Sequence, residues 1–200
     1  MRKAFGGLLI MIGLIVVGAA FYMRFEANRE QQKLKNSFRS AMEGLQEASP
    51  TGAIEEEEQD KQAVGGGNQQ KEITPIAMIT IPKIKLEAVV AEGTGDRLLN
   101  YALGHFTGTA MPGEKGNFSV AGHRTNTYGQ HFNRIHELSP GDIIMVESSA
   151  GTFEYSITES FIVNPDEVWV LNSSKESTIT LVTCTPGGKQ RVIVKGELNK

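Results

Sequence analysis

Three side chains of this 200-residue chain have the types needed for acyl transfer through a thioester. Cys184 is the single cysteine, Arg191 follows it by seven residues, and His123 lies upstream in an Ala-Gly-His-Arg run. A thiolate can attack a carbonyl, an imidazole can move protons, and a guanidinium can stabilise the charge that develops on oxygen. The competing interpretation is that an isolated cysteine packs as a small buried hydrophobe.

The spacing of Cys184 and Arg191 predicts that their side chains share one face of a β-hairpin. Residues 177–183 are rich in Thr, Ile, Leu and Val, and Arg191 opens a second apolar run. The intervening Gly187-Gly188 pair is typical of a two-residue hairpin turn, which would place Cys184 directly opposite Arg191. Opposed residues project from the same face with Cβ atoms about 5 Å apart. A cation at that distance also favours the reactive thiolate.

The other histidines and the neighbouring arginine are weaker candidates. His123 is preferred because it ends a predicted strand, a position that places a side chain at the rim of a barrel. His105 precedes a turn-rich segment, while His131 and His136 lack the spacing of a zinc-binding helix, so we interpret all three as structural. Arg124 would point to the face of an extended strand opposite that of His123.

The fold is predicted to be mainly β. From residue 73 onward, short apolar runs alternate with Gly- and Pro-rich turns, a pattern typical of a barrel or sandwich. The predicted strands are 76–81, 84–91, 117–121, 142–147, 152–157, 168–171, 177–183 and 191–198. Two short helices are predicted at 98–103 and 132–138. About 125 residues are enough for one domain with its own core.

The N-terminal residues predict a membrane anchor. The stretch 5–23 is nineteen residues long, strongly apolar and uncharged. At 1.5 Å per residue, a helix of this length comes close to spanning a bilayer core about 30 Å thick. A cleaved secretory signal peptide is the alternative, but the apolar run is longer than a usual signal core and no clear cleavage pattern follows it. We therefore expect an uncleaved transmembrane signal-anchor, whose orientation the flanking charges do not decide.

A polar segment separates this anchor from the β-rich part. Residues 24–47 carry a narrow apolar stripe at helical spacing, so this helix is expected to continue the anchor outward or to rest on the domain, with a marginal solvated helix as the alternative. The residues that follow are rich in Glu and Gly and predict a flexible linker. The expected units are therefore a tail at 1–4, the anchor at 5–23, the helix and linker at 24–72, and the β-rich domain at 73–200.

Composition argues against several classes of function. The net charge is −3, which disfavours nucleic-acid binding. The sequence carries no phosphate-binding loop, dinucleotide fingerprint or metal-ligand cluster, so we expect neither a cofactor nor a metal. The acidic run 55–58 is interpreted as solvated, because adjacent glutamates do not converge on one point. A single cysteine cannot form an intramolecular disulfide, so the thiol can stay free in an oxidising compartment.

Several of these motifs together resemble those of the sortases, the cysteine transpeptidases of Gram-positive bacterial surfaces. The run Thr180-Leu181-Val182-Thr183-Cys184 with Arg191 is similar to the family's TLxTC…R signature. The stretch 103–117 followed by Ala-Gly-His-Arg is similar to the segment that leads to the family's catalytic histidine, and 138–144 is similar to the start of its next strand. Residues 104–114 are more similar to classes C, D and E than to the housekeeping class, and we favour class D or E.

The resemblance implies a fold and a reaction. It implies a closed eight-stranded β-barrel, with the N-terminus inside the cell and the catalytic domain on the extracellular face. Cys184 would attack the Thr carbonyl of an LPxTG-like signal at the C-terminus of surface proteins, and the Thr–Gly bond would break. His123 would protonate the leaving amine and deprotonate the incoming one, which a lipid-linked peptidoglycan precursor would supply. Arg191 would stabilise the oxyanion or hold the substrate backbone, and Thr183 would help to position the peptide.

Two other functions fit parts of the pattern. One is a non-enzymatic surface adhesion or scaffold barrel in which Cys184 is merely packed, and the joint presence of His123 and Arg191 argues against it. The other is a purely hydrolytic cysteine peptidase. Product analysis with and without an added amine separates hydrolysis from transfer.

Overall fold

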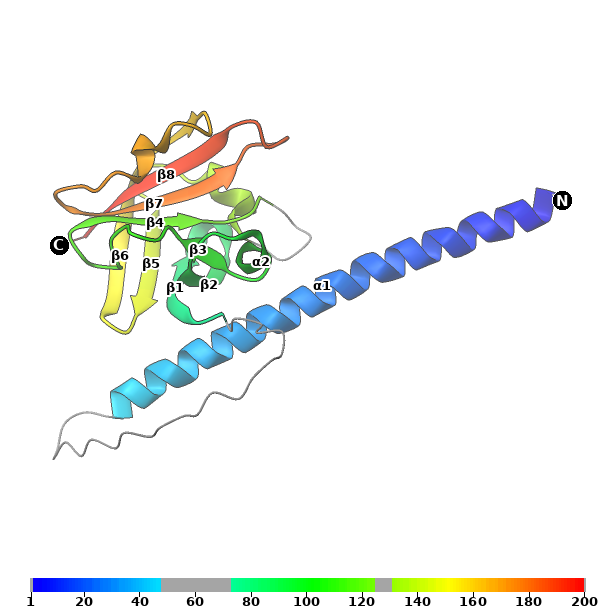
Figure 1. Ribbon diagram of the computed structural model, residues 1–200, viewed down its shortest axis with the longest axis horizontal. Coiled ribbons are helices and arrows are strands. Elements are labelled where there is room, and N and C mark those ends of the chain that lie inside the picture. The colour runs from blue at the N-terminus through cyan, green and yellow to red at the C-terminus, as the bar shows by residue number, and fades with distance from the viewer. Residues whose placement is uncertain (1, 48–72, 125–130, 200) are drawn as a thin grey trace, which may run out of the picture.

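The computed structural model describes residues 2–47, 73–124 and 131–199 of the chain (Figure 1). A long N-terminal helix, α1 (Arg2–Glu47), leads to a β-rich domain. The predicted linker lies at 48–72, outside the described residues. The predicted domain at 73–200 corresponds to the part of the described chain that contains all the strands.

Within the described residues, eight strands close into a barrel, as predicted. They are β1 (Pro75–Ile81), β2 (Leu86–Glu92), β3 (Leu103–His105), β4 (Gly116–Ala121), β5 (Ile143–Ser148), β6 (Gly151–Val163), β7 (Ser177–Cys184) and β8 (Arg191–Leu198). Their order around the barrel is β1-β2-β3-β4-β7-β8-β6-β5, and β5 pairs back onto β1. Most pairs are antiparallel, but β4 runs parallel to β7 and β2 runs parallel to β3.

The core fills the barrel because strand residues alternate between its two faces. On β7, Ile179 and Leu181 point inward and are fully buried, and on β4 Phe118 and Val120 do the same. Tyr155 of β6 is also fully buried, and its hydroxyl accepts the Gly113 N–H at 2.8 Å. Residues between these inward positions face outward, so Cys184 and Arg191 at the ends of β7 and β8 lie on the outer face of the sheet.

One predicted strand is wrong and one strand was missed. The run 168–171 forms a 3₁₀ helix, η3 (Val168–Leu171), which packs Val170 onto Ile193 outside the barrel. Only this one apolar residue of η3 is buried, because the segment covers the sheet instead of pairing with it. The helix predicted at 98–103 is shorter, α2 (Asp96–Leu99), and is followed by β3, which is too short to give an alternating pattern of its own.

Other boundaries differ for local reasons. The strand predicted at 84–91 begins later, at Leu86, because the 3₁₀ turn η1 (Pro82–Ile84) includes Ile84. Pro82 favours this turn, since proline cannot donate a hydrogen bond to a strand ladder. The predicted helix at 132–138 is a 3₁₀ helix, η2 (Phe132–Glu137). Strand β6 extends well beyond the predicted 152–157. The prediction ended early because a bulge after Ile157 interrupts the alternation of buried and exposed residues.

The C-terminal part of α1 lies against the barrel, on the side formed by β1 and β2 (Figure 1). Phe38 is buried, and Lys35 and Arg39 form ion pairs with Glu87 of β2 at 3.3 and 3.0 Å. Residues 24–47 therefore continue the N-terminal helix and rest on the domain, while a membrane anchor before them stays a prediction.

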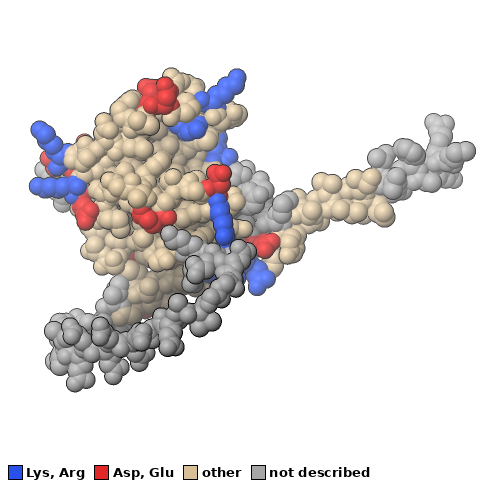
Figure 2. All heavy atoms as spheres, in the orientation of Figure 1, with Lys and Arg blue, Asp and Glu red and all other residues tan. Residues whose placement is uncertain are grey.

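The part of α1 that extends beyond the domain is apolar and exposed. Figure 2 shows a stretch of this helix without charged side chains. Its exposed large apolar residues are Met11, Ile12, Leu14, Ile15, Val16, Val17, Phe21, Tyr22 and Phe25. In the portion of the chain that the structure describes, no helix meets both the length and the apolarity required of a membrane span. The anchor predicted at 5–23 stays a prediction, and the side chains of 2–10 lie outside those described.

Candidate active site

The predicted cross-strand register of Cys184 with Arg191 is confirmed. Cys184 and Arg191 are direct cross-strand partners at the end of the β7–β8 ladder, and both are half-buried. The next pair is hydrogen-bonded, with Thr185 N donating to Gln190 O at 3.0 Å. Because hydrogen-bonded and non-hydrogen-bonded pairs alternate, Cys184 and Arg191 form a non-hydrogen-bonded pair, the type in which opposed side chains lie closest.

The turn of this hairpin is centred one residue earlier than predicted. Gly188 N donates to Thr185 O at 2.9 Å, which closes a turn around Pro186-Gly187 instead of Gly187-Gly188. Proline at the second position and a glycine with φ of 81° at the third are typical of a type II turn. The register of Cys184 with Arg191 is unaffected, because Thr185 still pairs with Gln190.

The Arg191 side chain is held against the hairpin that it opens. Its Nη1 donates to Gly188 O and to Gln190 O, each at 3.0 Å. A guanidinium has five N–H donors, so these two bonds fix its position and leave further donors for a substrate oxygen. The side chain can therefore present positive charge and directional hydrogen bonds beside Cys184.

The parallel pairing of β4 with β7 brings His123 to the same end of the sheet. Ala121 is the register partner of Val182, and Gly122 N donates to Val182 O at 3.0 Å. Extending this register by two residues sets His123 beside Cys184. Register partners in adjacent strands project from the same face, and His123 is half-buried. The strand order thus brings the three candidate residues to the same end of three neighbouring strands.

Thr183 is buried and its hydroxyl is engaged within the protein. Its exposed fraction is 2%, and Oγ1 donates to Gly122 O at 2.7 Å. The predicted contribution of Thr183 to peptide binding stays a prediction. Sequence reasoning missed Gly122, whose position directly before the candidate histidine was the available signal.

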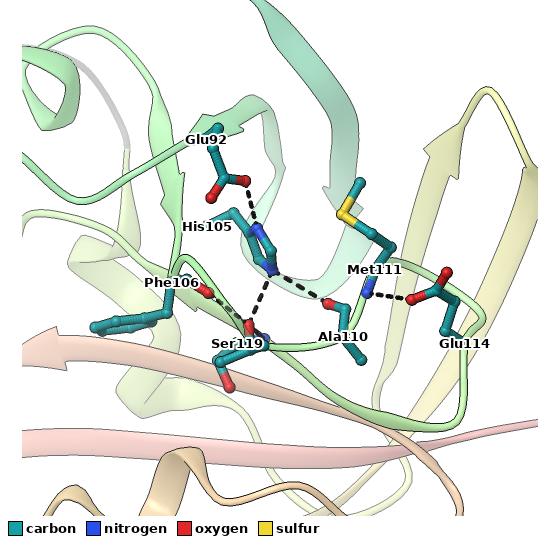
Figure 3. Close-up of polar contacts among 8 residues, drawn as sticks. Glu92, His105, Phe106, Ala110, Met111, Glu114 and Ser119 are labelled. Atoms are coloured by element: carbon teal, nitrogen blue, oxygen red, sulfur yellow. Dashed lines mark hydrogen bonds and ion pairs between the residues drawn. The ribbon is translucent and has the colours of Figure 1, made fainter.

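His105 lies in a different, buried network (Figure 3). Its Nδ1 lies 2.7 Å from Glu92 Oε2, and its Nε2 lies 2.9 Å from Thr109 Oγ1 and 3.1 Å from Ala110 O. Partial burial of Glu92 opposes its ionisation, but hydrogen bonds from His105 and Thr107 hold the pKa of this carboxyl below its usual value. This arrangement ties β2, β3 and the following turn together, as a structural histidine does.

The remaining candidates have other surroundings. His131 is buried, and its Nε2 lies 3.5 Å from Gln31 Nε2 of α1, while His136 is exposed on η2. Arg124 is half-buried at the edge of the described residues. Among the described side chains, no group of three or more His, Cys, Asp or Glu is placed to hold a metal ion. Charges of both signs are interspersed over the face of the domain seen in Figure 2.

Thiol, imidazole and guanidinium at one end of a β4–β7–β8 sheet can support acyl transfer through a thioester. The chain is also similar to known proteins of this kind. A family model described as the sortase domain matches residues 79–199. A Clostridium perfringens sortase D5 transpeptidase of known structure has a TM-score of 0.63 and 35% identity, and the match covers 86% of this chain and 98% of that one.

Curated relatives agree with this match. Sortase SrtE1 of Streptomyces coelicolor is 37% identical over 140 residues, which are 61% of this chain and 40% of that protein. Sortase D of Bacillus subtilis is 27% identical over 187 residues, which are 93% of this chain and 90% of that protein. This chain therefore spans about two fifths of the first relative and most of the second. It belongs to the sortase family, whose members are cysteine transpeptidases.

Proposed function

We propose that the chain is a membrane-anchored sortase that cleaves an LPxTG-like signal between Thr and Gly and transfers the protein to an amine. The observation that carries this proposal is the direct pairing of Cys184 with Arg191, with His123 on the neighbouring strand end. Family membership supports the same reaction. The similarity to a sortase D and to a sortase E supports class D or E for this chain.

The chemistry follows from the three side chains. The Cys184 thiolate attacks the Thr carbonyl carbon, and Arg191 donates hydrogen bonds to the oxyanion that forms. His123 gives a proton to the leaving amine of Gly, so that the peptide bond breaks and a thioester remains. The imidazole then takes a proton from the incoming amine, which attacks the thioester and releases the Cys184 thiolate.

Apolar side chains next to the site support recognition of an apolar peptide. Val170 of η3 packs on Ile193, which lies two residues beyond Arg191 on the same outer face of β8. The neighbouring Val168 and Trp169 are exposed, at 66% and 48%. We propose that η3 forms one wall for the Leu-Pro part of the signal.

The exposed apolar surface of α1 between residues 11 and 25 supports a membrane anchor. We propose that this part of α1 lies in the cell membrane, with the N-terminus inside and the catalytic domain on the extracellular face. The partners would be surface proteins with the C-terminal signal and a lipid-linked peptidoglycan precursor that supplies the amine. Confining enzyme and partners to one surface raises their effective concentration without new contacts.

The test uses the full chain in detergent micelles with a fluorogenic LPxTG-type peptide. We expect cleavage between Thr and Gly, a thioester at Cys184 by mass spectrometry, and a ligated product when an amine is added. Cys184→Ala should abolish both products and leave the fold unchanged. Cleavage without ligation at any amine concentration would favour the hydrolytic peptidase. Absence of thioester and cleavage across a peptide library would favour the scaffold barrel.

A further inference from the structure

A side-chain hydrogen bond joins the strand that carries Cys184 to the segment that carries His123. The buried Thr183 hydroxyl donates to Gly122 O at 2.7 Å. The N–H of Gly122 in turn donates to Val182 O at 3.0 Å. Both polar atoms of the Gly122 backbone are therefore held by β7, one by main chain and one by a side chain.

The other side of Gly122 is closed by apolar packing. A Cβ at this position would lie 2.7 Å from Leu103 Cδ2 and 2.7 Å from Phe132 Cδ2. Both of these side chains are fully buried, so neither has open space into which to move. Gly122 is thus fixed between β7 on one side and two core side chains on the other, and only a residue without a side chain fits there.

His123 is the next residue along the chain, so the Gly122 backbone sets where its side chain begins. The Thr183 hydroxyl is directed away from the face that carries the thiol, because successive strand residues project to opposite faces. Within the described part of the chain, the hydroxyl bonds the peptide unit that leads to His123. This geometry suits a residue that acts through the imidazole better than one that touches the peptide.

We propose that Thr183 is a positioning residue of the transpeptidation reaction, which holds Gly122 so that His123 reaches the Cys184 thiol and the amines. The proposal rests on the proposed function above, and it assigns the hydroxyl a role in turnover instead of peptide affinity. Thr183→Val keeps the shape of the side chain and removes the donor. A displacement of a reacting group by about 1 Å can cost about 10²-fold in rate.

The expected signature is a loss of kcat without a loss of peptide affinity. For Thr183→Val we expect kcat to fall by about 10- to 100-fold and KM to change by less than about threefold. Thr183→Ser keeps the donor and loses only a methyl group, so its kcat should stay within about threefold of the native value.

The chain contains a matched control at the other end of the same strand pair. Thr178 Oγ1 donates to Gly116 O at 3.2 Å, which is again a β7 threonine bonded to a β4 glycine carbonyl, although Ser174 Oγ also donates to Gly116 O at 2.9 Å and lies 2.8 Å from Thr178 Oγ1. Five residues separate the two threonines, a distance of about 16 Å along the strand. Thr178→Val should leave kcat unchanged and lower the melting temperature by less than Thr183→Val does, because Ser174 Oγ still donates to Gly116 O.

The experiment measures kcat and KM for the fluorogenic peptide at saturating amine, with melting temperatures, for the full chain and the three variants in micelles. A selective fall of kcat in Thr183→Val, restored in Thr183→Ser, supports the proposal. It is overturned if Thr183→Val behaves like Thr178→Val, or if KM rises while kcat is kept, which would make Thr183 a peptide-binding residue.

Two further outcomes are also decisive. If Thr183→Val melts below the assay temperature, Thr183→Ser still decides, because a fall in its kcat of more than about tenfold contradicts a role for the hydroxyl. If the native chain neither cleaves the peptide nor forms a thioester, the proposed function fails, and the positioning role is overturned with it. If only the positioning role is wrong, the native chain still cleaves the peptide and forms the thioester.

Discussion

Replacing Arg191 by Ala should lower kcat/KM by about 10²–10³-fold, or about 3–4 kcal/mol, if its guanidinium stabilises the oxyanion. The structure separates this loss from a change in stability. The two bonds from Nη1 to Gly188 O and Gln190 O are made at a half-buried position, and each contributes about 1 kcal/mol or less to folding. Their loss should therefore lower the melting temperature by a few degrees without unfolding the hairpin.

Two further variants sharpen this prediction. Arg191→Lys should recover only part of kcat/KM, since a compact ammonium cannot reproduce the planar fork of donors. Lys189→Ala removes a charge from the same turn at an exposed position, and it should change kcat/KM by less than about twofold. The readouts are steady-state kcat/KM and trapping of the thioester by mass spectrometry. Near-native kcat/KM in Arg191→Ala, or an equal loss in Lys189→Ala, would refute the oxyanion role.

Three other predictions follow from the arrangement of the domain. His123→Ala should lower turnover by at least about 10²-fold, whereas the exposed His136 should be replaceable by Ala with little effect; equal losses would mean that the wrong imidazole was assigned. The pKa of Glu92 is lowered in the folded protein, so its ionised form stabilises the fold at pH values above the unfolded-state pKa. This stabilisation is lost as the pH falls through the folded-state pKa. The melting temperature of Glu92→Gln should therefore be lower than native at pH 7 and converge with it in acid. The fragment 73–200 should give a β-rich circular dichroism spectrum, and a helix-dominated one would contradict its independent folding.

Local sequence patterns predicted the parts of the fold that depend on alternation and turn chemistry. Strand 191–198 and the facing of Cys184 with Arg191 were predicted because a short glycine turn leaves few possible registers. The parts that failed depend on tertiary contacts. The run 168–171 has strand-like composition, yet it packs one valine onto the outer sheet as η3. The three residues of β3 are ordered by their neighbours β2 and β4 and carry no pattern of their own.

The candidate site shows the same division. The sequence predicted His123, Cys184 and Arg191 as candidates because each lies in a short motif. The bond from Thr183 to Gly122 was not readable, because it joins residues 61 positions apart across a parallel pair. The position of Thr183 directly before Cys184 marks it in the sequence but does not show what its hydroxyl bonds, and Thr178 at the far end of the ladder also bonds a glycine carbonyl of β4.

The parallel pairing of β4 with β7 has a consequence for how the protein matures. The strand that ends before His123 emerges from the ribosome well before the strand that ends in Cys184, and the two meet only when long-range pairing is complete. Pairings of high sequence separation form late, because loop closure must precede the contacts that stabilise it. An incomplete chain therefore carries the imidazole before the thiol, and a partly folded chain carries the two groups apart. Neither species can form a thioester with a peptide. Enzymatic competence and global folding should appear in the same kinetic phase.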